Sequence, residues 1–139
     1  MRWALVSIAL LTACAPEATI EVIAPPFLVD SYPGNGSVIP ADQASPLLFR
    51  FSKDIADAAT ANQHITLEVM GDGNEATGTL PVGSCSTPTQ PVLLECSIDA
   101  ALDAGTRYRV TIGTGLNFLT GEALLSPHQR WFQTLPSSD

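Results

Sequence analysis

Residues 102–112, LDAGTRYRVTI, place a turn directly before a strand. Asp103 and Gly105 favour the turn, because both residue types tolerate the backbone angles that tight turns require. From residue 106 onward, large apolar side chains alternate with polar ones. The apolar set is Tyr108, Val110 and Ile112, and the polar set is Arg107, Arg109 and Thr111. Such strict alternation is typical of a strand with one face buried and one in water, so the sequence predicts a half-buried β-strand over 106–112.

The same alternation recurs along the rest of the chain. It is strict over 47–51 (LLFRF) and 64–69 (HITLEV), and less regular strands are expected at 27–32, 75–82, 92–98 and 129–135. Turn-forming runs separate these strands, notably PGNG at 33–36 and GDGN at 71–74, while DIADAATA at 54–61 is the one helix-like piece. About seven short strands between turns predict an all-β fold, a two-sheet antiparallel β-sandwich.

The first 13 residues have the pattern of an export signal. Arg2 supplies a positive charge, residues 3–11 are almost wholly apolar, and the small residues Thr12 and Ala13 precede Cys14. The apolar run is shorter than the ~20 residues that a helix needs to cross a bilayer. We therefore expect this segment to be removed rather than kept as an anchor.

The four residues LTAC at 11–14 resemble the lipobox of bacterial lipoproteins. The resemblance implies a diacylglycerol on the Cys14 sulfur, cleavage just before it, and a further acyl chain such as palmitate on the new amino group. Two or three acyl chains hold a protein firmly on a bilayer, whereas one holds it marginally. The alternative is an ordinary export signal with a chance cysteine. Since Ala15 rather than aspartate follows, the resemblance favours the outer membrane of the cell envelope.

These signals divide the chain into a lipoprotein signal peptide (1–13), a lipidated cysteine with a short tether (14–25) and one domain (26–135). Removing residues 1–13, and Arg2 with them, leaves 126 residues with five basic and 14 acidic side chains, a net charge of −9. That length is enough for one domain with its own core. So acidic a chain is repelled by phosphate backbones, which argues against a nucleic acid partner. Anionic lipid would repel it too, so the acyl chains must hold it on the membrane.

Three cysteines are an awkward number for an exported protein. Assigning Cys14 to lipid leaves Cys85 and Cys96, which an oxidising compartment allows to pair. Closing so short a loop should stabilise the fold by about 3 kcal/mol in the chain-entropy model. A metal site or two free thiols are the alternatives, although two cysteines without nearby histidines make a poor zinc set.

The order of these features resembles a bacterial Ig-like domain of the type found in surface-layer proteins. The matching pieces are the turn at 33–36, Phe51-Ser52 before an Asp-containing turn, the stretch LDAGTRY at 102–108, and Phe132-Gln133-Thr134. The loop at 115–122 departs from the pattern, since only Gly121 fits it well. The resemblance covers roughly residues 26–135 and implies a spacer, adhesive module or accessory domain rather than an enzyme.

The chain offers no catalytic motif, and neither a cofactor nor a metal is expected. Its two histidines, His64 and His128, are expected on the polar surface at strand starts. Asp72, Asn74 and Glu75 supply oxygen ligands of the kind that calcium prefers, but their spacing fits a hairpin turn better.

Trp131 is the candidate binding residue. Alternation in RWFQ at 130–133 points Phe132 inward and Trp131 outward. An exposed tryptophan can stack on a sugar or anchor a partner, and it can equally cover the edge of the sandwich. The sequence therefore predicts a membrane-anchored lipoprotein whose Ig-like domain is a non-catalytic structural or protein-interaction module. The alternative is a lipoprotein that recognises a glycan or peptide of the envelope through its loops or Trp131.

Overall fold

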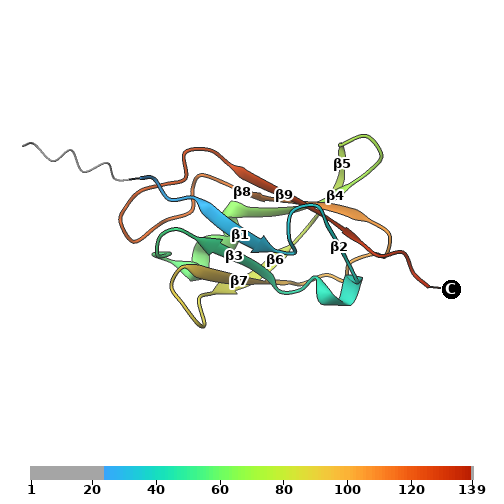
Figure 1. The fold of residues 1–139 in the computed structure, drawn as a ribbon, viewed down its shortest axis with the longest axis horizontal. Coiled ribbons are helices and arrows are strands. Elements are labelled where there is room, and N and C mark those ends of the chain that lie inside the picture. Colours follow the sequence, from blue (N-terminus) through green and yellow to red (C-terminus); the bar gives the residue numbers. More distant parts are fainter. Residues whose placement is uncertain (1–23, 139) are drawn as a thin grey trace, which may run out of the picture.

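The computed structural model describes residues 24–138, in which two β-sheets pack face to face (Figure 1). The four-stranded sheet has the order β1-β3-β7-β6 and contains β1 (Leu28–Tyr32), β3 (Leu47–Phe51), β6 (Val82–Ser86) and β7 (Leu93–Ile98). The five-stranded sheet has the order β2-β9-β8-β4-β5 and contains β2 (Ser37–Ile39), β4 (Ile65–Met70), β5 (Ala76–Leu80), β8 (Arg107–Ile112) and β9 (His128–Thr134). The predicted all-β sandwich is confirmed. The predicted signal peptide, Cys14 and most of the tether lie outside the described residues.

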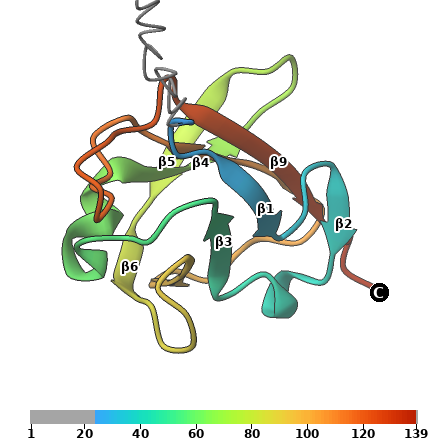
Figure 2. The same ribbon diagram turned by 60° about the vertical axis from the view of Figure 1, so that its left-hand side comes forward.

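One strand pair departs from the expected antiparallel pattern, because β2 runs parallel to β9. The chain turns sharply at the predicted PGNG run, where Gly36 adopts a φ of +77° and Ser37 N–H donates to Gly34 C=O at 3.0 Å. After this turn the three residues of β2 lie beside β9 rather than returning along β1 (Figure 2). All the other described strand pairs are antiparallel.

The strand predicted at 75–82 is two strands that belong to different sheets. β5 pairs with β4 in the five-stranded sheet, whereas β6 pairs with β7 in the four-stranded sheet. Pro81 separates them, and a proline cannot donate the N–H that would continue the ladder. The chain therefore changes sheets at this residue, which raises the number of strands above the predicted seven.

The helix-like piece is placed wrongly by the sequence pattern. Residues 24–138 contain two 3₁₀ helices, η1 (Ala41–Gln43) and η2 (Ala58–His64). Residues 54–57 precede η2 because Ile55 forms a β-bridge with Phe118 and its N–H donates to Pro91 C=O at 2.8 Å. Among residues 24–138, no helix is long and apolar enough to cross a bilayer.

Alternate side chains of both sheets fill the interior between them. β3 and β8 contribute the centre of this core, and each of these side chains is at most 2% exposed: Leu47, Phe49, Phe51, Tyr108, Val110 and Ile112. Burying one large apolar side chain contributes about 1.5–3 kcal/mol, so these two strands alone supply a large part of the driving force for folding.

A set of hydrogen bonds, which we call the latch, joins the turn and start of β8 (residues 103–108) to the end of β9 (residues 132–134). The buried Tyr108 hydroxyl accepts the Asp103 N–H at 2.8 Å, and its ring stacks on Phe132 at 5.3 Å between centroids. The Thr134 hydroxyl donates to Asp103 C=O at 2.6 Å and accepts the Thr106 N–H at 2.9 Å. The turn before β8 is thereby fixed to β9. This latch is the physical reason for the spacing of Gly-Thr-x-Tyr and Phe-x-Thr in this chain.

Candidate functional site

A row of interacting side chains crosses the outer face of the five-stranded sheet at Trp131. In the strand register, Trp131 on β9 lies opposite Arg109 on β8, and Arg109 lies opposite Glu68 on β4. The next residue along β9, Phe132, is buried in the core, as the alternation predicts. The register therefore gathers an aromatic ring, a cation and a carboxylate from three strands on one face.

The Trp131 ring is fixed between polar neighbours rather than free in solvent. The guanidinium carbons of Arg107 and Arg109 lie 5.1 Å and 5.4 Å from its centroid, within the range of cation–π attraction. Its backbone N–H donates to Asn35 Oδ1 at 2.9 Å, which ties β9 to the turn before β2. The ring is half-buried, so only part of its surface is available to a partner.

The two arginines beside Trp131 differ in their charge balance. Arg109 binds Glu68 in a bidentate manner, with Nη2 at 2.9 Å and 3.0 Å from the two carboxylate oxygens. Arg107 donates to the neutral amide oxygen of Asn74 at 3.0 Å. Within residues 24–138, no carboxylate lies at ion-pair distance from Arg107. Arg107 therefore keeps an uncompensated positive charge next to the ring in a strongly acidic protein.

Two shallow hollows flank the Arg107 side chain. The first, of about 230 Å³, lies between β2 and β9 and is lined by Trp131, Ser37, Val38 and Gln133 together with Arg107. The second, of about 350 Å³, lies toward the β4–β5 turn and is lined by Asp72 and Thr106 together with Arg107 and Gln133. Arg107 and Gln133 are partners in the strand register, so they form the ridge shared by both hollows.

The groups around the first hollow suit recognition rather than chemistry. Arg107 and Gln133 can donate hydrogen bonds, and Trp131 offers an apolar wall. Ser37, which also lines this hollow, has a buried hydroxyl without a hydrogen-bond partner among the described residues. Tryptophan and arginine are the residue types that dominate the energetics of protein interfaces. This combination can therefore hold a polar partner by contact.

The predicted disulfide is present. Cys85 on β6 and Cys96 on β7 lie directly opposite each other in the four-stranded sheet, and their sulfur atoms are bonded. Both residues are buried in the core, so the bridge joins two strands from the inside of the sandwich. The two cysteines lie on the two strands of a hairpin, since β6 and β7 are consecutive and antiparallel. Cys14, the predicted lipidation site, lies outside the described residues.

The two histidines lie at one end of the five-stranded sheet, near the end of β8. His64 ends η2, and its carbonyl accepts the Gly113 N–H at 2.7 Å. His128 begins β9, where burial, and secondarily the nearby charge of Arg130, lower the pKa of its ring below the usual value. In the part of the chain that the structure describes, no group of three or more His, Cys, Asp or Glu side chains is placed to hold a metal ion.

The run that could have bound calcium is a hairpin turn between β4 and β5. Gly71 N–H donates to Glu75 C=O at 2.9 Å, and Asn74 adopts a φ of +67°. The Asn74 side-chain oxygen accepts a hydrogen bond from Arg107, as described above. This oxygen thereby contributes to the outer surface of the five-stranded sheet around Trp131, Arg107 and Arg109, which we call the Trp131 face.

The sequence predicts Trp131 as a binding residue but does not predict its partners. It places Arg107 and Arg109 on the wet face of their strand, and no local pattern indicates that this strand neighbours the one carrying Trp131. The available signal was composition, since two of the five basic residues after position 13 fall within three positions of each other. In an acidic chain, such a local concentration of arginine points to a specific use of positive charge.

Comparisons with known proteins agree with the observed architecture. The sequence model described as a bacterial Ig-like domain matches residues 22–134. The fold is similar to CopC from Methylosinus trichosporium OB3b, with a TM-score of 0.56 and 15% identity over 82% of this chain and 97% of that chain. It is similar to PcoC, a copper resistance protein from Escherichia coli, with a TM-score of 0.55 and 17% identity over 78% of this chain and 98% of that chain.

Domains of the surface layer protein SbsC also share the fold. Over its domains 1–6 the TM-score is 0.60 and the identity 16%, covering 85% of this chain but only 15% of that one. No curated protein matches the chain by sequence. At identities this low, the likeness to solved structures concerns the fold alone.

Proposed function

Because the chain belongs to the bacterial Ig-like domain family, we propose that it is a non-catalytic interaction module, anchored in the cell envelope by lipid on Cys14. The observation that carries the interaction role is the Trp131 face, where an uncompensated arginine, a fixed aromatic ring and a hollow of about 230 Å³ meet. The family assignment supports a module of this kind rather than an enzyme.

The anchoring part of the proposal rests on the LTAC run at 11–14. Ala15 after the cysteine favours the outer membrane, as in the lipoproteins that the run resembles. The present disulfide supports export, because such bonds form and persist in oxidising compartments. A lipid anchor would also account for the odd cysteine, which would otherwise be left as a single thiol.

Anchoring is tested by intact mass and by flotation with membranes. The wild-type protein purified from a host that processes lipoproteins should lack residues 1–13, carry acyl mass on residue 14 and float with vesicles. Cys14→Ser should carry no acyl mass and leave the floating fraction. A Cys14→Ser protein that is cut at the same place and still floats would exclude lipid on Cys14 as the anchor.

The interaction role is tested by capture from an envelope extract with paired variants. Trp131→Ala should lose a partner that the wild-type protein retains, whereas Gln129→Ala should keep it, because Gln129 is exposed on the same strand two residues away. Equal melting temperatures of the two variants establish that both are folded. A partner retained equally by both variants would place the interaction elsewhere on the domain.

Direct recognition of a glycan or peptide is the second candidate, and the hollow beside Trp131 favours it. After removal of residues 1–13, Trp131 is the one remaining tryptophan of the two in the sequence. Its fluorescence therefore reports the hollow without labelling. Saturable quenching by soluble cell-wall fragments, abolished by Arg107→Ala, would support this candidate over protein capture, and a flat titration would reject it.

A further inference from the structure

Exposed apolar side chains gather at the end of the sandwich where the described chain begins. Leu125 is 82% exposed, Leu119 is 70% exposed and Phe27 is 50% exposed, although each is a large hydrophobic residue. We call these three residues the apolar tip. Leu119 and Leu125 belong to the long β8–β9 connection, which lies beside the entering chain in Figures 1 and 2.

The apolar tip is held in place by the core beneath it. In the β8–β9 connection, Phe118 and Leu124 are buried, while the residues that follow them, Leu119 and Leu125, point into solvent. The Leu119 N–H donates to Asp54 C=O at 2.9 Å. The two exposed leucines therefore lie on a loop that buried neighbours and a backbone hydrogen bond hold in place.

Phe27 is tied to the same edge of the domain. Its N–H donates to the Ser52 hydroxyl at 3.0 Å, and its carbonyl accepts the Ser52 N–H at 2.9 Å. Ser52 is two residues from Asp54, which holds Leu119, so both contacts lie along one short segment. Phe27 and Leu125 also line one hollow of about 260 Å³ together with Ala24, where the described chain begins.

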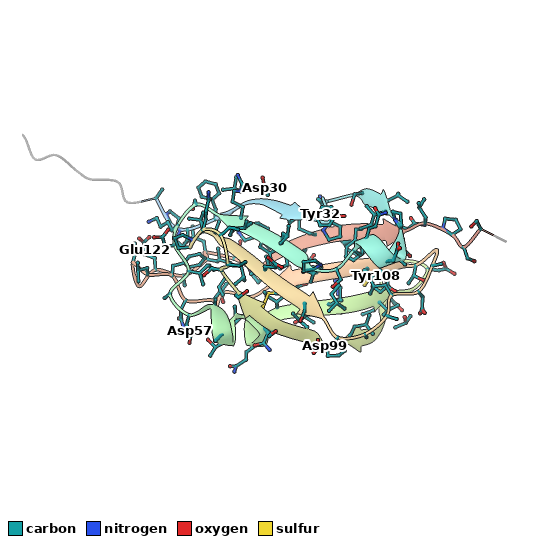
Figure 3. All side chains as sticks on the ribbon, turned by 90° about the horizontal axis from the view of Figure 1, so that it is seen from below. Asp30, Tyr32, Asp57, Asp99, Tyr108 and Glu122 are labelled. Atoms are coloured by element: carbon teal, nitrogen blue, oxygen red, sulfur yellow. A yellow bond between two sulfur atoms is a disulfide. The ribbon has the colours of Figure 1, made fainter. Side chains whose placement is uncertain are left out.

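The two segments that carry the apolar tip hold little charge, in contrast to the acidic chain as a whole. Residues 24–29 and 115–127 contain a single charged side chain, Glu122. Its carboxylate lies 2.7 Å from Lys53 Nζ, which neutralises it. Figure 3 places Glu122 at the end of the molecule where the described chain begins. Asp54, whose carbonyl accepts the Leu119 N–H, adds one carboxylate that forms no ion pair among the described residues. The apolar tip therefore meets an anionic surface with less repulsion than the rest of this acidic chain would.

The covalent path from Cys14 brings the apolar tip close to any lipid attached there. Ten residue steps separate Cys14 from Ala24, and a chain extends by at most about 3.3–3.6 Å per residue, or about 35 Å in all. Ala24 lines the hollow shared by Phe27 and Leu125. A bilayer holding the acyl chains would thus lie within reach of this end of the domain at all times.

We propose that the apolar tip docks onto the bilayer that holds the acyl chains of Cys14, and so orients the domain on the membrane. This rests on the lipid anchoring proposed above. Leu119 and Leu125 enter the interface between headgroups and acyl chains, where exposed apolar side chains gain from leaving water. The acyl chains hold the protein on the membrane, and the apolar tip fixes which end faces it.

Tryptophan fluorescence on vesicles tests the docking. The acylated protein is reconstituted on phosphatidylethanolamine and phosphatidylglycerol vesicles that carry bromine on the acyl chains. Trp131 is replaced by Phe, and a single probe is introduced as Leu125→Trp. Val38→Trp is the matched control, because Val38 is 54% exposed and lies on β2, away from the entering chain. Both positions are exposed enough to accept the larger ring.

Docking predicts that the Leu125→Trp emission shifts to the blue and falls at least about twofold on the brominated vesicles, while Val38→Trp stays unchanged. Adding Leu119→Asp should reduce the quenching of Leu125→Trp without releasing the protein. A Leu125→Trp probe that is not quenched on a protein that still floats overturns docking and leaves anchoring intact. If light scattering then shows doubled mass, a second copy covers the apolar tip instead. A protein with no acyl mass that does not float overturns the anchoring, and the docking with it.

Discussion

The latch at Tyr108 predicts a difference in stability between two chemically identical substitutions. The chain has two tyrosines, and each hydroxyl makes a 2.8 Å hydrogen bond to the backbone. Tyr108 is fully buried and accepts from the Asp103 N–H, whereas Tyr32 is 40% exposed and donates to the Gln43 carbonyl. Phenylalanine removes one hydroxyl in each case. The Tyr108 hydrogen bond is part-buried whereas the Tyr32 one is exposed, so water replaces the lost partner less readily at the Asp103 N–H than at the Gln43 carbonyl.

The expected magnitudes follow from that difference in water access. An unpaired buried donor costs about 1–3 kcal/mol, and the Asp103 N–H is only part-buried, so Tyr108→Phe should lower the free energy of unfolding by about 1 kcal/mol. Tyr32→Phe should change it by less than about 0.5 kcal/mol, as surface substitutions do. In urea, with a slope of about 2 kcal/mol per molar, the midpoint should fall by about 0.5 M for Tyr108→Phe alone. Equal shifts for the two variants would refute the reasoning.

A second substitution checks that the loss comes from the latch itself. Thr134→Val removes the hydroxyl that donates to Asp103 C=O and accepts from Thr106 N–H. Tyr108 and Thr134 bind the N–H and the C=O of the same residue, Asp103. The losses of stability caused by Tyr108→Phe and Thr134→Val should therefore not add, and their coupling energy should be about 0.5–3 kcal/mol. Strictly additive losses in the double variant would mean that the two hydroxyls act independently and that no latch exists.

Three further perturbations test the disulfide, the start of β9 at His128 and the Trp131 face. Replacing Cys85 and Cys96 together by Ala should lower the free energy of unfolding by about 3 kcal/mol in urea; a loss below about 1 kcal/mol would contradict the chain-entropy account. Because burial and Arg130 lower the pKa of His128 in the folded state, its contribution to stability is present above the unfolded pKa of 6.5 and is lost as the pH falls below it. The urea midpoint should therefore fall on acidification below that value, less steeply in His128→Gln, and parallel pH profiles would refute this. Glu68→Gln leaves the half-buried Arg109 without its carboxylate and should cost about 1 kcal/mol in thermal unfolding, whereas a gain would show that the pair does not stabilise the fold.

Strands that bury one face were predictable because their pattern is local. The predictions at 47–51 and 106–112 match β3 and β8 to within one residue, since each strand carries its own alternation. β2 carries none, because its three residues become a strand only by lying beside β9, almost a hundred positions later. The break between β5 and β6 did have a local signal. Pro81 lies within the strand predicted at 75–82, and a proline at such a position argues against one continuous strand.

The site was predictable in part for the same reason. Trp131 could be placed on the outer face from the residues next to it, and the arginines could be placed on the wet face of their own strand. That Arg109 stands opposite Trp131 is a property of the pairing of β8 and β9, which no local pattern contains. The uncompensated charge of Arg107 is equally non-local, because it depends on Asn74 in a turn of another hairpin.

The proposed binding face and the proposed membrane contact are joined by a single strand. β9 starts at His128, which lines the hollow beside Phe27 and Leu125, and it passes Trp131 before reaching Gln133 at the ridge between the other two hollows. Five residue steps of a strand cover about 17 Å. If the apolar tip docks on the bilayer, Gln133 and Arg107 stand about that far along β9 from the lipid-facing end. In that orientation the ridge of Arg107 and Gln133 would face partners beyond the headgroup layer. A domain free to rotate on its tether would not hold the ridge in that direction. Disrupting the apolar tip by Leu119→Asp should therefore weaken capture of a membrane-distal partner even though neither the acyl anchor nor the Trp131 face has changed.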